Sequence, residues 1–136
     1  MITSQVLYAG DLRTQAKHIF SGTEILTDAP PDNQGKGEAF SPTDLVATAL
    51  ASCMLTIMGI AARTHGLDIV GTRVDVTKIM ASNPRRISEI HCNMVIPDRG
   101  FGPKEKAILE HAARTCPVMQ SLSTDIRKVI TFTYGA

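Results

Sequence analysis

The apolar pattern of the chain is densest in residues 45–62, a segment without any charged residue. A helix built from this segment has apolar side chains on nearly every side, and such a helix must be buried. Ser41, Pro42 and Asp44 form an S-x-x-D capping box with proline at the first helical position, which predicts where the helix begins. Gly66 predicts where it ends, at about residue 64.

Alternation of apolar and polar residues predicts strands on both sides of this helix. The segments that carry the pattern are 2–9, 14–20, 23–27, 68–80, 86–96 and 127–134. Turn signals between neighbouring segments predict hairpins. The segment 28–40 is rich in Pro, Gly and Asn, and it predicts a mobile surface loop without regular structure.

A second helix is expected from Pro103 to about Thr115, because apolar residues recur there at helical spacing. Proline favours the first turn of a helix, so Pro117 predicts a short third helix with Cys116 at its N-cap. Together these elements predict an α+β fold with a largely antiparallel sheet and a long buried central helix. One protomer cannot easily cover a helix that is apolar all round, so we also expect a homodimer built around that helix.

Length and composition favour a single globular domain over residues 1–136, with 43% hydrophobic and 20% charged residues. The formal net charge of +1, without a long Lys/Arg cluster, argues against nucleic acid as a partner. The segment 45–62 is near the lower length limit for a membrane span, but its many small residues favour a core helix. The N-terminal residues lack the pattern of a secretory signal, and we expect a cytoplasmic protein.

Three cysteines are too few, and odd in number, for a disulfide framework. Cys92 lies on the apolar face of its predicted strand, and we interpret it as a side chain that packs in the core. Cys116 has better grounds for reactivity, because backbone N–H groups at a helix N-terminus stabilise a thiolate, although a cysteine at a helix junction can also be structural. Cys53 lies about three turns from the N-terminus of its helix, so it needs another positive group, with Arg13 and Arg63 as candidates. Without that group Cys53 is an unreactive side chain that packs in the core.

The remaining candidate ligands do not form a metal site. There is no C-x-x-C motif, and the histidines occur singly, at His18, His65, His91 and His111. A zinc site needs four ligands at suitable spacing. We therefore expect no metal and no other cofactor.

Three segments together resemble the OsmC/Ohr family of thiol-dependent peroxidases: SPTDLVATALASC in the long helix, TCPVMQSL late in the chain, and Y-x-G-D from Tyr8 to Asp11. The resemblance covers essentially the whole chain, and it implies an intertwined homodimer with two active sites at its interface. It implies that the Cys53 thiolate attacks a hydroperoxide and that Cys116 resolves the resulting sulfenic acid as a disulfide. A thiol reductant, either a dithiol or a dihydrolipoyl carrier, would then restore both thiols.

The resemblance also implies an arginine from the N-terminal strands that holds the thiolate, and an acid after the helix-start proline that orients this arginine. Arg13 is the best match for the arginine, but Thr43 follows the proline, and the nearest acids are Glu38 and Asp44. Asp44 is also needed in the capping box. This departure from the family pattern leaves a second function open, a non-enzymatic dimer of the same fold that binds a small hydrophobic ligand.

Overall fold

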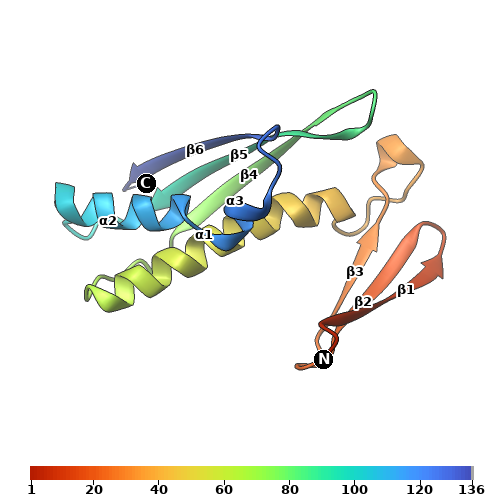
Figure 1. The fold of residues 1–136 in the computed structure, drawn as a ribbon, viewed down its shortest axis with the longest axis horizontal. Coiled ribbons are helices and arrows are strands. Elements are labelled where there is room, and N and C mark those ends of the chain that lie inside the picture. The colour runs from red at the N-terminus through yellow and green to blue at the C-terminus, as the bar shows by residue number, and fades with distance from the viewer. Residues whose placement is uncertain (136) are drawn as a thin grey trace. The chain divides into compact units, whose positions relative to one another are not determined.

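The computed structural model describes residues 1–135, and Figure 1 shows its helices and strands. The elements are β1 (Ser4–Gly10), β2 (Arg13–His18), β3 (Glu24–Asp28), the 3-10 helix η1 (Pro31–Asn33), α1 (Pro42–Thr64), β4 (Arg73–Ala81), β5 (Arg86–Ile96), α2 (Pro103–Arg114), α3 (Pro117–Ser121) and β6 (Arg127–Tyr134). The expected α+β class and the expected order of elements are confirmed. The strands, however, divide into two three-stranded sheets, β1-β2-β3 and β4-β5-β6.

The two sheets differ in strand direction. The sheet β1-β2-β3 is antiparallel throughout, whereas β4 and β5 pair antiparallel and β5 and β6 pair parallel. Parallel neighbours need a crossover connection, and α2 and α3 supply it between β5 and β6.

The chain forms two compact units, Met1–Val46 and Ala47–Ala136. The first unit holds the sheet β1-β2-β3, the segment that follows it and the first turn of α1. The second holds the rest of α1, the sheet β4-β5-β6 and the helices α2 and α3. That the two units act as a single domain stays a prediction.

In the first unit, the turn between β1 and β2 places Arg13 at the beginning of β2. Asp11 and Leu12 both have positive φ, 54° and 62°, as the two central residues of a type I′ hairpin turn require. In the antiparallel register of β2 with β3, Arg13 is the partner of Asp28, the last residue of β3. The hairpin register therefore brings a cation and an anion to the same end of this sheet.

The segment between β3 and α1 is more ordered than its composition predicts. It contains η1, and its backbone closes on itself through Asn33 N–H to Pro30 O (2.9 Å) and Gly37 N–H to Ala29 O (3.2 Å). Glycine is required at position 35, because a Cβ there would lie 1.7 Å from the carbonyl oxygen of Ala29. The expectation of a segment without regular structure is therefore wrong, since these residues fold into a compact loop.

The helix α1 begins and ends where the sequence predicts. The Ser41 hydroxyl accepts the Asp44 N–H, and the Asp44 carboxylate accepts the Ser41 N–H, both at 3.0 Å, which completes the capping box. Gly66, just beyond the helix, has a φ of 66°. Among the described residues, α1 is long and apolar enough to cross a membrane, a property that it shares with the core helices of soluble proteins.

Within the second unit, α1 packs one face into the core and leaves another face exposed. The buried α1 side chains are Ala47, Leu50, Ala51, Met54, Met58 and Ala62. They pack with the inner face of β5 and with the apolar stripe of α2. On the opposite side Ile60 is 58% exposed, so one protomer does not cover a helix that is apolar all round.

The strand β4 begins later than predicted. It starts at Arg73, not at residue 68, because Gly71 (φ 95°) and a backbone bond from Thr72 N–H to Ile69 O form a turn before it. Val70, predicted on the buried face of this strand, is consequently 77% exposed.

Candidate active site

Cys53 lies in the middle of α1, on the border between the buried and exposed faces. It is half-buried, and it packs against the core cluster of the second unit. Helical spacing explains this position, since Leu50 and Met54 are directed fully into the core. The thiol is thus held by a rigid helix while it keeps partial access to solvent.

Cys116 lies where the sequence places it, at the N-cap of α3. Its Sγ accepts a hydrogen bond from the Met119 N–H at 3.4 Å, and Pro117 occupies the first helical position. The side chain is nevertheless fully buried, and this burial raises the pKa of the Cys116 thiol above its ordinary value. The backbone donors act in the opposite direction but are outweighed, so Cys116 is a protonated thiol rather than the thiolate that its N-cap position favours.

The Cys53 and Cys116 side chains lie close enough to one another that Cys53 affects the pKa of Cys116, and both cysteines are free thiols. The neighbouring Cys53 side chain is a further cause of the raised pKa of Cys116, after burial. The fold thus brings the two cysteines together within the second unit.

Cys92, the third cysteine, is a core residue, as predicted. It is fully buried on β5, and burial raises the pKa of its thiol to about 11, with a smaller contribution from Cys116. A thiol with so high a pKa carries almost no thiolate at neutral pH.

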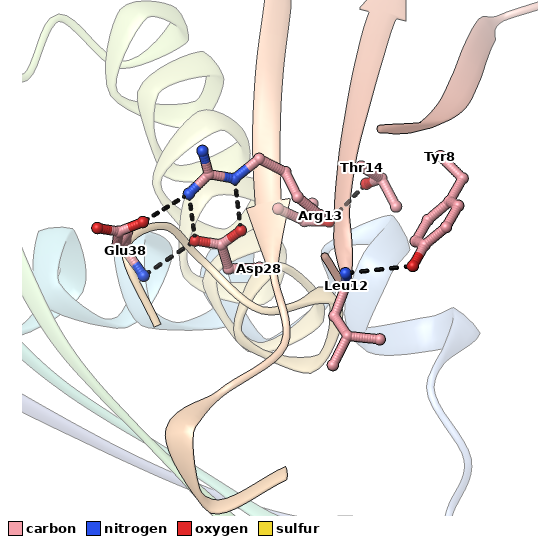
Figure 2. Close-up of polar contacts among 7 residues, drawn as sticks. Tyr8, Leu12, Arg13, Thr14, Asp28 and Glu38 are labelled. Carbon is pink, nitrogen blue, oxygen red and sulfur yellow. Dashed lines mark hydrogen bonds and ion pairs between the residues drawn. The ribbon is translucent and has the colours of Figure 1, made fainter. Parts of the chain in front are cut away.

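Arg13 is held in the first unit by two carboxylates, as Figure 2 shows. Its Nε donates to Asp28 Oδ1 at 2.7 Å and its Nη2 to Asp28 Oδ2 at 2.9 Å, a bidentate pair. The same Nη2 donates to Glu38 Oε1 at 2.9 Å. Hydrogen bonding from Arg13 lowers the pKa of Asp28, and these two acids, chiefly Asp28, raise the pKa of Arg13 well above its ordinary value.

The structure places the residues selected from the sequence in two clusters, one in each unit. Cys53 and Cys116 meet in the second unit, and Arg13 meets Glu38 in the first. Asp44 forms the capping box of α1 with Ser41, which is the role that the sequence favours for it.

Sequence reasoning missed Asp28. A signal for it was present, because pairing the predicted strands 14–20 and 23–27 as a hairpin places a residue near position 28 opposite Arg13. The apolar pattern alone did not extend the third strand to this acid. The residue that most firmly binds Arg13 was therefore left among the loop residues.

The structure thus places two neighbouring free thiols, one on a long helix and one at a helix N-cap, in an α+β fold with two three-stranded sheets. The family model described as OsmC-like protein matches residues 35–130. The chain thus belongs to the OsmC family, as its sequence motifs indicate.

Solved structures agree with this assignment. A protein of Psychrobacter arcticus 273-4, provisionally named an osmotic stress induced and detoxification response protein, is 55% identical, with 97% of this chain and 96% of that chain covered and a TM-score of 0.93. An OsmC-like protein of Mycoplasma pneumoniae is 20% identical, with coverage of 98% and 96% and a TM-score of 0.81. An organic hydroperoxide resistance protein OsmC of Legionella pneumophila is 14% identical, with 98% of both chains covered and a TM-score of 0.75. A search of curated proteins found no match to this chain.

Proposed function

We propose that this protein is a thiol-based peroxidase that reduces organic hydroperoxides, with Cys53 as the peroxidatic and Cys116 as the resolving cysteine. The observation that carries the proposal is that two free thiols, on α1 and at the N-cap of α3, lie beside one another. The Legionella pneumophila protein of the same fold is an organic hydroperoxide resistance protein by name, which supports the substrate class.

The proposed reaction begins when the Cys53 thiolate attacks the terminal oxygen of the hydroperoxide. The O–O bond breaks, the alkoxide takes up a proton and leaves as the alcohol, and Cys53 becomes a sulfenic acid. Cys116 then attacks the Cys53 sulfur, a disulfide forms, and water is released. An external dithiol or a dihydrolipoyl carrier reduces this disulfide by thiol exchange and is itself oxidised. No metal or other cofactor takes part in these steps.

Arg13 is the proposed positive group that favours the Cys53 thiolate. Its charge is permanent, because a guanidinium stays protonated at neutral pH, and its carboxylate partners raise its pKa further. Glu38 and Asp28 hold this guanidinium, and Asp44 supports the beginning of α1 through the capping box. The acid function that the family pattern places at position 43 is here assigned to acids that contact Arg13 directly.

A homodimer is the proposed assembly, since the exposed face of α1 needs a cover. Ala49, Cys53, Thr56 and Ile60 recur at alternating spacings of four, three and four residues along this face. Such spacing suits packing against a second helix, and small residues allow close approach. Neither nucleic acid nor a membrane is a partner in this proposal, and the location is cytoplasmic.

The dimer is tested by placing a charge on this face. We expect Ile60→Glu to convert a dimer into a monomer, measured by sedimentation velocity, because the carboxylate would be buried in an apolar interface. The matched control is Val70→Glu, which adds the same charge at a position that is 77% exposed. A wild-type monomer, or an Ile60→Glu protein of unchanged mass, would refute the dimer.

The peroxidase is tested by stopped-flow oxidation of the reduced protein with cumene hydroperoxide. In the wild type we expect loss of two thiols per chain and formation of one disulfide. In Cys53→Ser we expect no oxidation at the rate of the wild type. Cys92→Ala serves as the control, since Cys92 has no role in the proposed reaction. Retention of both thiols in the wild type, or an undiminished rate of oxidation in Cys53→Ser, would refute the proposed peroxidase activity.

The second function considered, binding of a small hydrophobic ligand, receives no support from the surface of the first unit. A pocket of about 470 Å³ lies there over β1, β2 and β3. Its lining is mixed, because the polar or charged side chains of Gln5, Gln15, Lys17 and Glu24 lie beside Val6 and Leu7. A small hydrophobic ligand needs a predominantly apolar pocket.

A further inference from the structure

The segments that carry Cys53 and Cys116 contain neither charged side chains nor histidine. This holds for residues 45–62 around Cys53 and for residues 115–124 around Cys116. Both cysteines belong to the apolar core of the second unit, which also holds Met54 and Met119. Carboxylate and imidazole ligands are thus absent from both segments, and the two neighbouring sulfurs are what these segments offer to a metal ion.

The number of ligands decides which metal ions fit this pair. Within residues 1–135, no group of three or more His, Cys, Asp or Glu side chains is placed to hold a metal ion, so Cys92 does not complete a set of three. Structural Zn²⁺ takes four ligands, and Ca²⁺ and Mg²⁺ take oxygen ligands. An ion held by Cys53 and Cys116 must instead accept two ligands, both of them sulfur.

Monovalent copper meets both requirements. Thiolate and thioether sulfurs are soft ligands that select Cu(I), whereas carboxylates and carbonyls suit Mg²⁺, Ca²⁺ and Mn²⁺. Because Cu(I) has a filled d shell, it also accepts two ligands in a line. The neighbouring side chains are of the same soft kind, since Met54 is fully buried in the core and Met119 packs against it. The chemistry of the pair therefore favours Cu(I) over these divalent ions.

The surroundings also accommodate the charge of such a complex. Two thiolates and one Cu(I) carry a net negative charge, and burial of an unpaired charge is costly. The Met119 N–H already donates to Cys116 Sγ at 3.4 Å, and this hydrogen bond strengthens when the sulfur is negative. Cys53 is only half-buried, so solvent reaches its side of the pair. The ion can therefore enter from the Cys53 side, while the sulfur of Cys116 keeps its donor.

We propose that Cys53 and Cys116 form a two-sulfur binding site for Cu(I), which is present in the reduced protein and is lost when the two cysteines form a disulfide. Binding breaks two S–H bonds, forms two Cu–S bonds and gives both protons to the solvent, while copper keeps its oxidation state. The inference goes beyond the proposed function, because it requires the thiol pair itself and not a reaction of the pair with hydroperoxide.

The first arm of the test is a competition for Cu(I) with the coloured chelator bathocuproine disulfonate, under nitrogen and with the thiols reduced beforehand. We expect the wild type and Cys92→Ala to take one Cu(I) per chain from the chelator. Cys53→Ser and Cys116→Ser should each bind more than about a hundredfold more weakly, since loss of a ligand exceeds the cost of losing an outer partner of a ligand. No binding by the wild type, wild-type affinity in either serine variant, or a comparable loss in Cys92→Ala would overturn the proposal.

The second arm identifies the ligands by X-ray absorption at the copper edge of the loaded wild type. We expect a first shell of two sulfurs, and nitrogen or oxygen in that shell, or a third sulfur, would overturn the proposal. Alkylation by iodoacetamide, followed by mass spectrometry, then shows which thiols are bound. Cu(I) should protect Cys53 in the wild type and in Cys92→Ala but not in Cys116→Ser, and an unprotected Cys53 in the loaded wild type would contradict the site.

A serine in place of the buried Cys116 can disturb folding, so the wild type itself supplies a further control. Diamide joins Cys53 and Cys116 in a disulfide without any change of sequence, and peptide mapping verifies the bond. This form should bind no Cu(I), and reduction with dithiothreitol followed by desalting should restore binding, whereas binding by the disulfide form would overturn the site. Failure of the wild type to consume hydroperoxide would refute the proposed function alone, since no arm of this test uses a hydroperoxide.

Discussion

The two clusters of candidate chemistry use burial in opposite ways. In the first unit Asp28 is buried and stays charged, because Arg13 lies against it and lowers its pKa. In the second unit Cys116 is equally buried and keeps its proton, because burial without a close cation raises the pKa of a thiol. Burial alone therefore does not decide the charge of a group, and the nearest partner does.

The same comparison explains why both clusters are needed for the proposed chemistry. The thiol pair supplies two electrons and a proton donor but no positive charge of its own. The arginine cluster supplies a permanent positive charge but no nucleophile. Four predictions test this division, in order of decreasing expected effect.

The largest effect is expected for Cys116→Ser. Turnover with a dithiol reductant should fall by more than about a hundredfold, because the disulfide cannot form, while the first oxidation of Cys53 stays within about tenfold of the wild type. The sulfenic acid should accumulate and can be trapped with dimedone and detected by mass spectrometry. An unmodified Cys53 after peroxide treatment would contradict the assigned roles.

Arg13→Ala should destabilise the protein at neutral pH, because it leaves Asp28 charged and buried without its partner. The melting temperature should fall clearly, and the double variant Arg13→Ala/Asp28→Asn should recover part of the loss, since a neutral amide is less costly to bury. Differential scanning calorimetry measures both. If the double variant were less stable than Arg13→Ala, Asp28 would not depend on Arg13 for its stability.

At alkaline pH we expect Cys92, in the second unit, to reduce the free energy of unfolding. Its pKa is about 11 in the folded protein and about 9.0 in the unfolded chain, so the unfolded chain loses this proton first as the pH rises. The free energy of unfolding should therefore fall between about pH 9 and 11, by about 2 to 3 kcal/mol at most from this group. Urea titrations of wild type and Cys92→Ala check it, and the variant should show a flatter dependence on pH.

At acid pH we expect Asp28, in the first unit, to reduce the free energy of unfolding. This is the smallest of the four expected effects. Its folded pKa lies below its ordinary value of 3.8, so its stabilising contribution is present above that value and is lost as the pH falls through the folded pKa. Acid unfolding followed by tyrosine fluorescence should shift in Asp28→Asn toward a weaker dependence on pH. An identical acid transition in both proteins would show that the ion pair carries no pH-linked stability.

Local sequence patterns by themselves determined much of this protein. The capping box of Ser41 and Asp44, the glycine after α1 and Pro117 after Cys116 depend on residues within one turn of each other, so sequence spacing predicts them. The alternation that places Cys92 on a buried face is equally local. The two cysteines of the candidate site and Arg13 followed from motifs carried by such segments.

Tertiary structure alone decided how these pieces act. The pairing of Arg13 with Asp28 joins residues 15 apart through a strand register, and the raised pKa of Cys116 follows from burial by elements far away in the chain. The division of the strands into two sheets depends on which edges pair, a choice that no single segment encodes. Ion pairing and desolvation depend on neighbours in space, and therefore the sequence alone indicated the candidate residues, while the fold decided the partners of Arg13 and the raised pKa of Cys116.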